Sequence, residues 1–278
     1  MPRLNDADEI RRLLRRDPGW SVYALGDLGP AMFPKTTWFT PDLTLVLRDY
    51  GTAILFAMGA GSVREALATL DGPVHLQVRQ DALDEIRRWS SVSSAQRMWR
   101  MVWSGDPAPA RSDAPARLGA HDVEALQRLY ADGQASGESP DFFFPSMVTD
   151  GVFHGIREGH EIVAVAGTHL VSWEEGVASI GNVYTRRDRR GRGLGRLVVA
   201  GVLGDLVGIE TIGLNVRADN VAAIHLYESL GFARHCEFFE GLAEGPRREG
   251  VPRQVSNNLR ASPSGSSTIR QGSSNTIV

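Results

Sequence analysis

A glycine-rich loop between a β-rich run and an apolar helical pattern is the segment best suited to chemistry; it lies within residues 180–199. Glycines let the backbone approach a phosphate and turn successive N–H groups toward it, and the positive end of the following helix adds to the attraction. Six arginines between Arg186 and Arg196 supply further positive charge. The segment therefore predicts an anion-binding site. The residues expected to form it are Arg190, Gly191, Arg192, Gly193, Leu194, Gly195 and Arg196.

Other phosphate-binding loops fit this segment poorly. No Gly-Lys-Ser/Thr follows, which excludes a Walker loop, and neither the glycine spacing nor an acidic ribose ligand supports a dinucleotide fingerprint. An arginine-rich, solvent-exposed turn is the alternative. We expect no nucleic-acid partner, because Tyr184 is the only aromatic residue among the arginines and a phosphate loop already accounts for them.

A second informative segment, residues 214–232, has the pattern of a strand followed by a helix that begins near Val221. In such a helix Tyr227 lies one or two turns from the N-terminus, where a phenol can face the strand ends and act as a general acid. Packing of Tyr227 in the core beside Leu226 and Leu230 is the alternative.

The two segments together resemble the GNAT N-acetyltransferase superfamily. Arg190, Gly193 and Gly195 match its Arg/Gln-x-x-Gly-x-Gly/Ala signature, and residues 214–232 resemble its second motif. The resemblance covers residues 117–240. It implies a GNAT fold, a mixed and mostly antiparallel sheet flanked by helices, and acetyl-CoA as the acyl donor, with the pyrophosphate held by the glycine loop.

The resemblance also implies roles for individual residues. Asn220 matches the residue that contacts the cofactor near the helix start, and Tyr227 matches the tyrosine that protonates the departing thiolate. The central-strand residues that correspond to those offering backbone groups to the pantetheine arm are Val183, Tyr184 and Thr185.

The general base is less clearly marked. Many family members carry a glutamate on the central strand, whereas residues 178–180 are Ala, Ser and Ile here. His169 on the preceding strand is the best substitute, because the pKa of imidazole is near neutrality and the rate would then rise with pH through about 6 to 7. A buried structural histidine, or an amine that loses its proton through water, is the alternative.

Residues 132–145 form a long, poorly patterned stretch that ends in Phe142, Phe143 and Phe144. Loops of this length are usually functional. These aromatic side chains are expected either to line an acceptor pocket or to pack in the core beneath the loop.

Composition places the chain among globular proteins. Thirty basic against 33 acidic residues leave a formal net charge of -3 over 278 residues. The single cysteine, Cys236, allows no intrachain disulfide and is surrounded by no metal-ligand spacing, so we expect a reducing compartment and no metal. No signal peptide and no apolar run long enough to span a bilayer are evident. The sequence therefore predicts a cytoplasmic protein with no membrane partner.

Proline and alanine in residues 106–115 predict a linker between two domains. We expect an N-terminal α/β domain over residues 1–105, the GNAT domain over 116–243, and a disordered tail over 244–278, where aromatic residues are absent.

The two domains begin alike. Arg3, Leu4 and Asp8 recur at the same offsets as Arg117, Leu118 and Asp122. The N-terminal domain is therefore either a degenerate copy of the GNAT unit or unrelated, since an Arg-Leu pair before an acidic helix start is common.

Hydrophobic periodicity predicts alternating strands and helices in both domains. The expected strands are residues 43–47, 53–58, 74–78, 98–103, 152–156, 162–171, 177–185, 211–216 and 233–238, and the expected helices are 62–70, 82–89, 122–131, 195–207 and 221–230.

The expected function is an acetyl-CoA-dependent N-acetyltransferase that transfers the acetyl group directly to the amine of an acceptor. The acceptor has no readable code in the sequence. One alternative is a non-catalytic CoA-binding regulatory or interaction module, which the missing strand glutamate would suit. Another is an acyltransferase that uses a different acyl-CoA.

Overall fold

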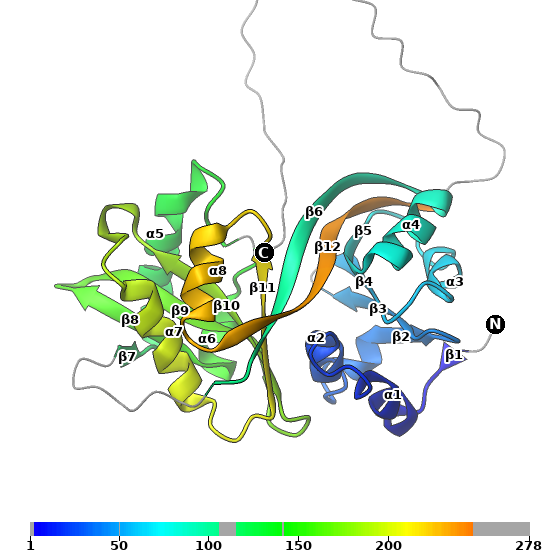
Figure 1. Cartoon of the computed structure of the whole chain (residues 1–278), viewed down its shortest axis with the longest axis horizontal. Coiled ribbons are helices and arrows are strands. Elements are labelled where there is room, and N and C mark those ends of the chain that lie inside the picture. Colours follow the sequence, from blue (N-terminus) through cyan, green and yellow to red (C-terminus); the bar gives the residue numbers. More distant parts are fainter. Residues whose placement is uncertain (1–2, 50, 106–114, 141, 247–278) are drawn as a thin grey trace, which may run out of the picture.

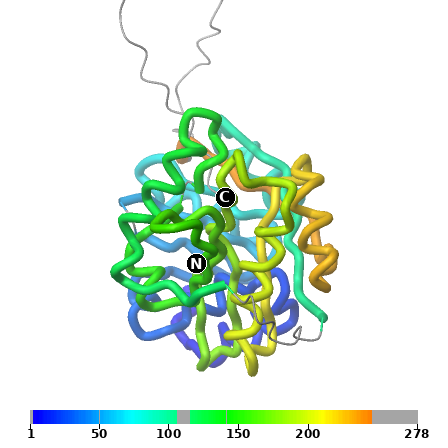
Figure 2. The backbone as a smooth tube through the Cα atoms, turned by 90° about the vertical axis from the view of Figure 1, so that its left-hand side faces the viewer, coloured from blue at the N-terminus to red at the C-terminus, as the bar shows by residue number. Residues whose placement is uncertain are grey.

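The computed structural model describes residues 3–49, 51–105, 115–140 and 142–246. They form a 12-stranded mixed sheet in the order β1-β2-β3-β4-β5-β12-β6-β11-β10-β9-β8-β7. Figure 1 shows the first half of the chain, blue to cyan, on the right and the second half, green to yellow, on the left. Figure 2, turned by 90°, shows the second half in front of the first.

The first half begins with a short strand and two helices. Asp6 caps the first helix, because its carboxylate accepts the N–H groups of Asp8 and Glu9. Helices α3 and α4 pack on one face of this half of the sheet, and α1 and α2 on the other. Its elements are β1 (Arg3–Leu4), α1 (Ala7–Leu14), α2 (Val22–Gly26), η1 (Phe33–Lys35), β2 (Thr36–Phe39), β3 (Thr44–Asp49), β4 (Thr52–Ala57), α3 (Val63–Leu67), β5 (Val74–Val78), α4 (Gln80–Trp89) and β6 (Ser90–Trp103).

The second half repeats this order of α-helices and strands. Helices α7 and α8 pack on one face of its strands, whereas α5 and α6 pack on the opposite face. Its elements are β7 (Ala116–Arg117), η2 (Ala120–Asp122), α5 (Val123–Gln134), α6 (Pro145–Asp150), β8 (Phe153–Glu158), β9 (Glu161–Ser172), β10 (Val177–Thr185), η3 (Arg187–Arg189), α7 (Leu194–Asp205), β11 (Thr211–Arg217), α8 (Val221–Glu228) and β12 (Phe232–Pro246).

The correspondence between the halves extends to strand direction. β4 pairs parallel with β5 in the first half, as β10 does with β11 in the second. The short first strand of each half carries one of the repeated arginines, Arg3 in β1 and Arg117 in β7. The sequence repeat thus coincides with the start of the same topological unit in both halves.

The last strand of each half is exchanged. β6 and β12 form a long antiparallel ribbon, from Phe232 opposite Trp103 to Pro246 opposite Ser90. β12 also pairs with β5 of the first half, and β6 pairs with β11 of the second. Figure 1 shows the two strands crossing together from one half to the other. Each half therefore depends on the other for the completion of its sheet.

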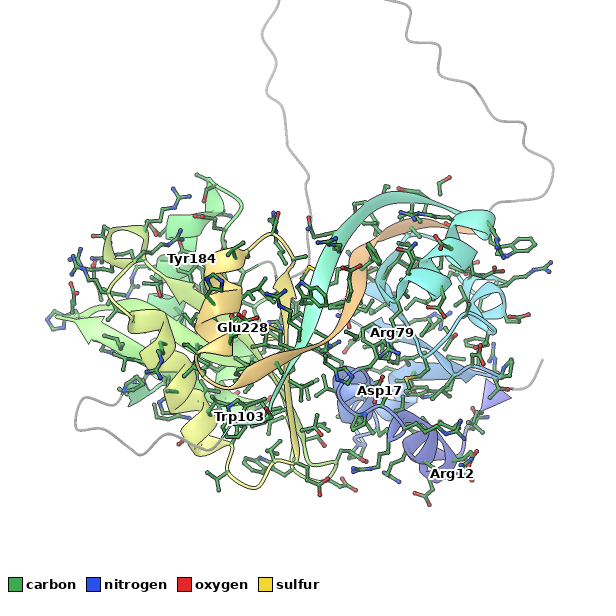
Figure 3. The ribbon with its side chains drawn as sticks, viewed as in Figure 1. Arg12, Asp17, Arg79, Trp103, Tyr184 and Glu228 are labelled. Atoms are coloured by element: carbon green, nitrogen blue, oxygen red, sulfur yellow. The ribbon has the colours of Figure 1, made fainter. Side chains whose placement is uncertain are left out.

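Polar contacts hold the exchanged strands in place. The indole N–H of Trp103, in β6, donates to the Leu230 carbonyl at 2.8 Å. Asp17 forms ion pairs with Arg79 at 2.5 Å and with His235 of β12 at 2.6 Å. Figure 3 shows Asp17 and Arg79 close together in the first half, far from Tyr184 of β10.

All of the expected helices and strands are present, but several boundaries differ. β6 begins at Ser90 rather than at 98, and β12 continues to Pro246, past the domain end expected at 243. Residues 90–97 were not expected in a strand because their side chains are mostly small and polar and alternate poorly. Residues 106–114 of the expected linker and 247–278 of the expected tail lie outside the described residues. The helices of the described ranges include none that is long and apolar enough to cross a membrane.

Candidate active site

Two neighbouring strands of the second half diverge. β10 pairs parallel with β11 from Val177 to Ile180, and beyond this point β10 continues beside β9 while β11 continues beside β6. A register shift follows Gly181, and Asn182 adopts a left-handed backbone with φ 53°. The divergence leaves the β11-facing edge of residues 181–185 open to hydrogen bonding by a bound chain.

The residues expected to contact the pantetheine arm lie on this edge. Val183 and Thr185 are half-buried, and Tyr184 is buried with its hydroxyl donating to Asp132 at 2.9 Å. The Asn182 carbonyl is already used, because it accepts a hydrogen bond from the Tyr130 hydroxyl at 3.0 Å. The edge is thus rigidly supported from α5.

The glycine loop connects the end of β10 to α7. Gly191 and Gly193 have φ values of 75° and 76°, a conformation that favours glycine, and Gly193 is the N-cap of α7. A Cβ atom at either position would meet nothing within 4 Å, so the space outside the loop is open. The unsatisfied N–H groups at the start of α7, including that of Leu194, lie at this opening.

Whereas Gly191 and Gly193 face open space, Gly195 allows close helix packing. A Cβ atom there would lie 3.0 Å from Leu226 Cδ1, so this glycine permits the close approach of α7 to α8. The loop and the second motif are in contact for this reason.

Carboxylates already pair with some of the loop arginines. Arg190 donates to both oxygens of Glu138, at 3.1 and 3.2 Å, and Arg187 also binds Glu138. The hydrogen bond from Arg190, followed by one from Ser136, lowers the pKa of Glu138 to about 2. Arg192 and Arg196, by contrast, form no ion pair within the described part of the chain, so their charges are available to a ligand.

The second motif places its two expected residues on α8. Asn220 is the N-cap, and its Oδ1 accepts the Ala223 N–H at 3.1 Å. Tyr227 is only 8% exposed and belongs to the cluster that packs α7 and α8 on the sheet. Burial raises the pKa of Tyr227 well above its usual range, so the phenol is protonated at neutral pH.

His169 lies on the opposite face of the sheet, at the divergence. Its Nδ1 is 2.9 Å from the Tyr23 hydroxyl, and its Nε2 is buried with no hydrogen-bond partner among the described residues. A Cβ atom at Gly181 would lie 2.2 Å from Nε2, so the ring rests directly on the β10 backbone.

The ionisation of His169 differs from the expectation. Burial, with a further contribution from the Arg100 charge, lowers its pKa to about 4. This pKa lies below the 6 to 7 expected for a pH limb, because sequence alone does not reveal the burial of the ring or the nearby Arg100 charge. The imidazole is neutral at physiological pH.

A cavity of about 320 Å³ lies between the halves and includes His169 in its wall. Phe142 and Phe144 line it, whereas Phe143 packs against Tyr130 with ring centroids 5.0 Å apart. The aromatic triplet therefore divides between the two expected environments. The first half supplies part of the wall from α2, β3, β4 and β5.

Several polar residues of the cavity carried no signal in the sequence. Tyr23, Asp27 and Glu240 line it, yet the short helix α2, the residue after it and the middle of β12 matched no motif. A group of three or more His, Cys, Asp or Glu side chains suited to a metal ion is absent from the described ranges.

The strand divergence, glycine loop and capped helix all lie within one segment that a family model matches. Residues 121–232 match the family model described as the acetyltransferase (GNAT) family. The resemblance read from the two motifs is thereby confirmed.

Curated relatives include two kinds of acetyltransferase. The mycothiol acetyltransferase of Corynebacterium aurimucosum is 33% identical over 186 residues, which cover 63% of this chain and 54% of that protein. The [ribosomal protein bS18]-alanine N-acetyltransferase of Escherichia coli strain K12 is 38% identical over 79 residues, which cover 28% of this chain and 51% of that protein. The chain thus matches about half the length of these relatives.

Solved structures share the architecture of both halves. A GNAT-family acetyltransferase from Novosphingobium aromaticivorans superposes with a TM-score of 0.60 at 21% identity, covering 80% of this chain and 96% of that one. A GCN5-related N-acetyltransferase from Kribbella flavida gives 0.53 at 18% identity, covering 82% and 96%. The expected GNAT fold is confirmed.

Proposed function

We propose that this protein is an acetyl-CoA-dependent N-acetyltransferase that transfers the acetyl group directly to an acceptor amine. The observation that carries the proposal is the open glycine loop at the start of α7, next to the divergence of β10 from β11. Backbone N–H groups of residues 191–195, with Arg192 and Arg196, would bind the pyrophosphate. The open edge of β10 would bind the pantetheine arm.

The proposed reaction uses groups on both faces of the sheet at the point where β10 and β11 diverge. The neutral amine attacks the thioester carbonyl from the cavity, forming a C–N bond, while backbone N–H groups of β10 stabilise the oxyanion. The C–S bond then breaks, and Tyr227, on the α7/α8 face, gives its proton to the thiolate. The surplus proton on nitrogen passes to His169 Nε2 or to water. A histidine whose pKa is lowered to about 4 would not retain that proton at neutral pH.

The acceptor side favours a small molecule. The bS18-alanine relatives act on a ribosomal protein according to their name, whereas the cavity beside His169 is partly walled by the first half of this chain. A pocket of this volume suits a small ligand. The mycothiol acetyltransferase relatives match more of the chain than the bS18 relatives do.

The domain roles that we propose follow the same division. Residues 116–243 carry the cofactor site and the acid, and residues 1–105 form a degenerate copy of the same unit. The identical order of α-helices and strands and the two parallel strand pairs support a common origin of the halves.

Acetyl-CoA binding and turnover test the proposal separately. Calorimetry of the full chain should show acetyl-CoA binding, and a thiol-release assay should show CoA release that depends on an added amine. Acetyl-CoA binding without amine-dependent release of CoA from any acyl-CoA would favour the non-catalytic module. The absence of a glutamate on the central strand also supports that alternative. An absence of binding would refute both functions.

A further inference from the structure

The cavity between the halves has an uneven charge distribution. Its lining includes the carboxylates of Asp27, Asp150 and Glu240, and within the described residues it includes no lysine or arginine. His169, the remaining titratable nitrogen base in the wall, is neutral at physiological pH. A ligand that enters the cavity therefore meets negative charge.

Asp27 is the most unusual of these carboxylates. It follows α2 in the first half, is half-buried, and forms no hydrogen bond or ion pair through its side chain within the ranges that the structure describes. The charged side chain that acts on it is Asp49, which is also acidic and is itself paired with Lys35 at 2.8 Å. Burial, with the Asp49 charge in addition, raises the pKa of Asp27 to about 7. A cation in the cavity would relieve both effects.

Glu240 is better compensated. Its Oε1 accepts the Asn215 amide at 2.8 Å, and the charge of the fully buried Arg100 acts on it from behind the wall. Asp150 is exposed at the rim, at the end of α6. Asp27 within the cavity and Asp150 at its rim are thus the charges left for a ligand.

Much of the remaining wall is apolar. Phe142 and Phe144 approach from the second half and Leu45 and Ile54 from the first. A hydrocarbon chain would be desolvated by these side chains, whereas a second carboxylate on the ligand would be repelled.

We propose that the acceptor is an amine that carries a second cationic group on an apolar body, and that Asp27 of the first half is the residue that selects it. This inference rests on the proposed function, since it assigns the acceptor class of the same site. It gives the first half a direct part in substrate recognition. The reacting amine lies near His169, and the second cation binds the Asp27 carboxylate.

Calorimetry of the full chain, with and without saturating CoA, tests this inference directly. The probes are 1,5-diaminopentane, pentylamine and 5-aminopentanoate, which share a five-carbon chain and differ in their terminal group. The diamine should bind about 10- to 100-fold more tightly than pentylamine, as expected for one buried charge-assisted hydrogen bond. The aminopentanoate should bind most weakly.

Variants isolate the contribution of Asp27. Asp27→Asn should reduce diamine affinity to that of pentylamine and leave pentylamine affinity unchanged. Asp71→Asn, at an exposed position outside the cavity, is the matched control and should change neither. Thermal denaturation checks folding, and Asp150→Asn at the exposed rim provides a second variant, with a smaller loss expected.

The outcomes separate this inference from the proposed function. Equal binding of the three probes, or an unchanged diamine affinity in Asp27→Asn, overturns the cation site even if monoamines are acetylated. A loss in kcat with unchanged binding would assign Asp27 to proton transfer instead and also overturns it. Failure to bind acetyl-CoA refutes the proposed function, whereas the diamine measurement without CoA still decides the cation site.

Discussion

The connection from β4 to α3 in the first half corresponds in topology to the connection from β10 to α7 in the second. In the first half, the Gly61 N–H donates to Asp42 Oδ2 at 2.9 Å, and a Cβ atom on Gly61 would lie 2.6 Å from that oxygen. In the second, the space outside Gly191 and Gly193 is open. A carboxylate of the chain itself thus occupies the first loop, in the way that a phosphate would occupy the second.

The helices that follow the two loops also make the second half better suited to bind a phosphate. α3 has five residues and α7 has 12, so α7 offers the longer helix dipole. Counted from their first residues, α8 has Tyr227 in seventh place and α4 has Ile86. The two halves therefore share one topology but differ in the chemistry of their loops and helices. The difference lies in a few side chains rather than in the sheet.

The largest expected effect concerns the acid. Tyr227→Phe should lower kcat by about 100- to 10,000-fold with little change in acetyl-CoA affinity, because the ring still packs but has no proton to give. Ile86→Val is the matched control in the first half and should leave turnover unchanged. Steady-state thiol release measures both. An unaltered rate in Tyr227→Phe would mean that another group protonates the thiolate or that chemistry is not limiting.

Blocking the open loop comes next. Gly193→Val should weaken acetyl-CoA binding by roughly 100-fold, because a side chain there separates the N–H groups from the pyrophosphate. Gly51→Val imposes similar backbone strain, since Gly51 has φ 75° and open space around it, but lies in a first-half hairpin. Calorimetry of the two variants distinguishes a lost site from a destabilised fold. Equal affinities would refute the assigned pyrophosphate site.

The pH profile examines the contact between the halves at His169. Because its pKa is lowered to about 4, the neutral base is present above that pH and is lost as the pH falls through it. If His169 is the base, kcat/KM should fall about tenfold per unit below pH 4, and His169→Gln should remove that limb. A variant profile that superimposes on the parent's after scaling would eliminate the histidine as base.

The next variant weakens the contact of the Asp42 carboxylate with the loop between β4 and α3. Asp42→Asn should cost about 1 kcal/mol of unfolding free energy through the weakened Gly61 hydrogen bond. It should not create a second cofactor site, since that loop lacks an arginine next to its glycines. Calorimetric stoichiometry should remain one acetyl-CoA per chain. A stoichiometry of two would show that Asp42 alone keeps the first half from binding.

The smallest effect concerns competition for arginine. Glu138→Gln should raise acetyl-CoA affinity about two- to fivefold, because Arg190 and Arg187 would no longer be held by an exposed ion pair. Glu85→Gln, which breaks the Arg88 pair of α4 in the first half, is the control and should have no effect. A lower affinity in Glu138→Gln would instead show that the pair pre-positions Arg190 for the cofactor.

The sequence by itself determined the parts of this protein that are built from contiguous residues. The glycine loop, the start of α7 and the α8 motif are local, because backbone N–H groups and a helix N-terminus are made by neighbours in the chain. Hydrophobic alternation likewise predicted β5 and β10, whose bounds match the expected ones.

Only the tertiary structure decided the acceptor side. The Tyr23–His169 hydrogen bond joins residues 146 positions apart, and the lowered pKa of His169 depends on the burial that this contact produces. The exchange of β6 and β12 had no local signal either, since residues 90–97 are polar and gain their strand partners from the far end of the chain. Desolvation and pairing between distant segments are collective properties of the folded chain, and they set the charge of the cavity around Asp27.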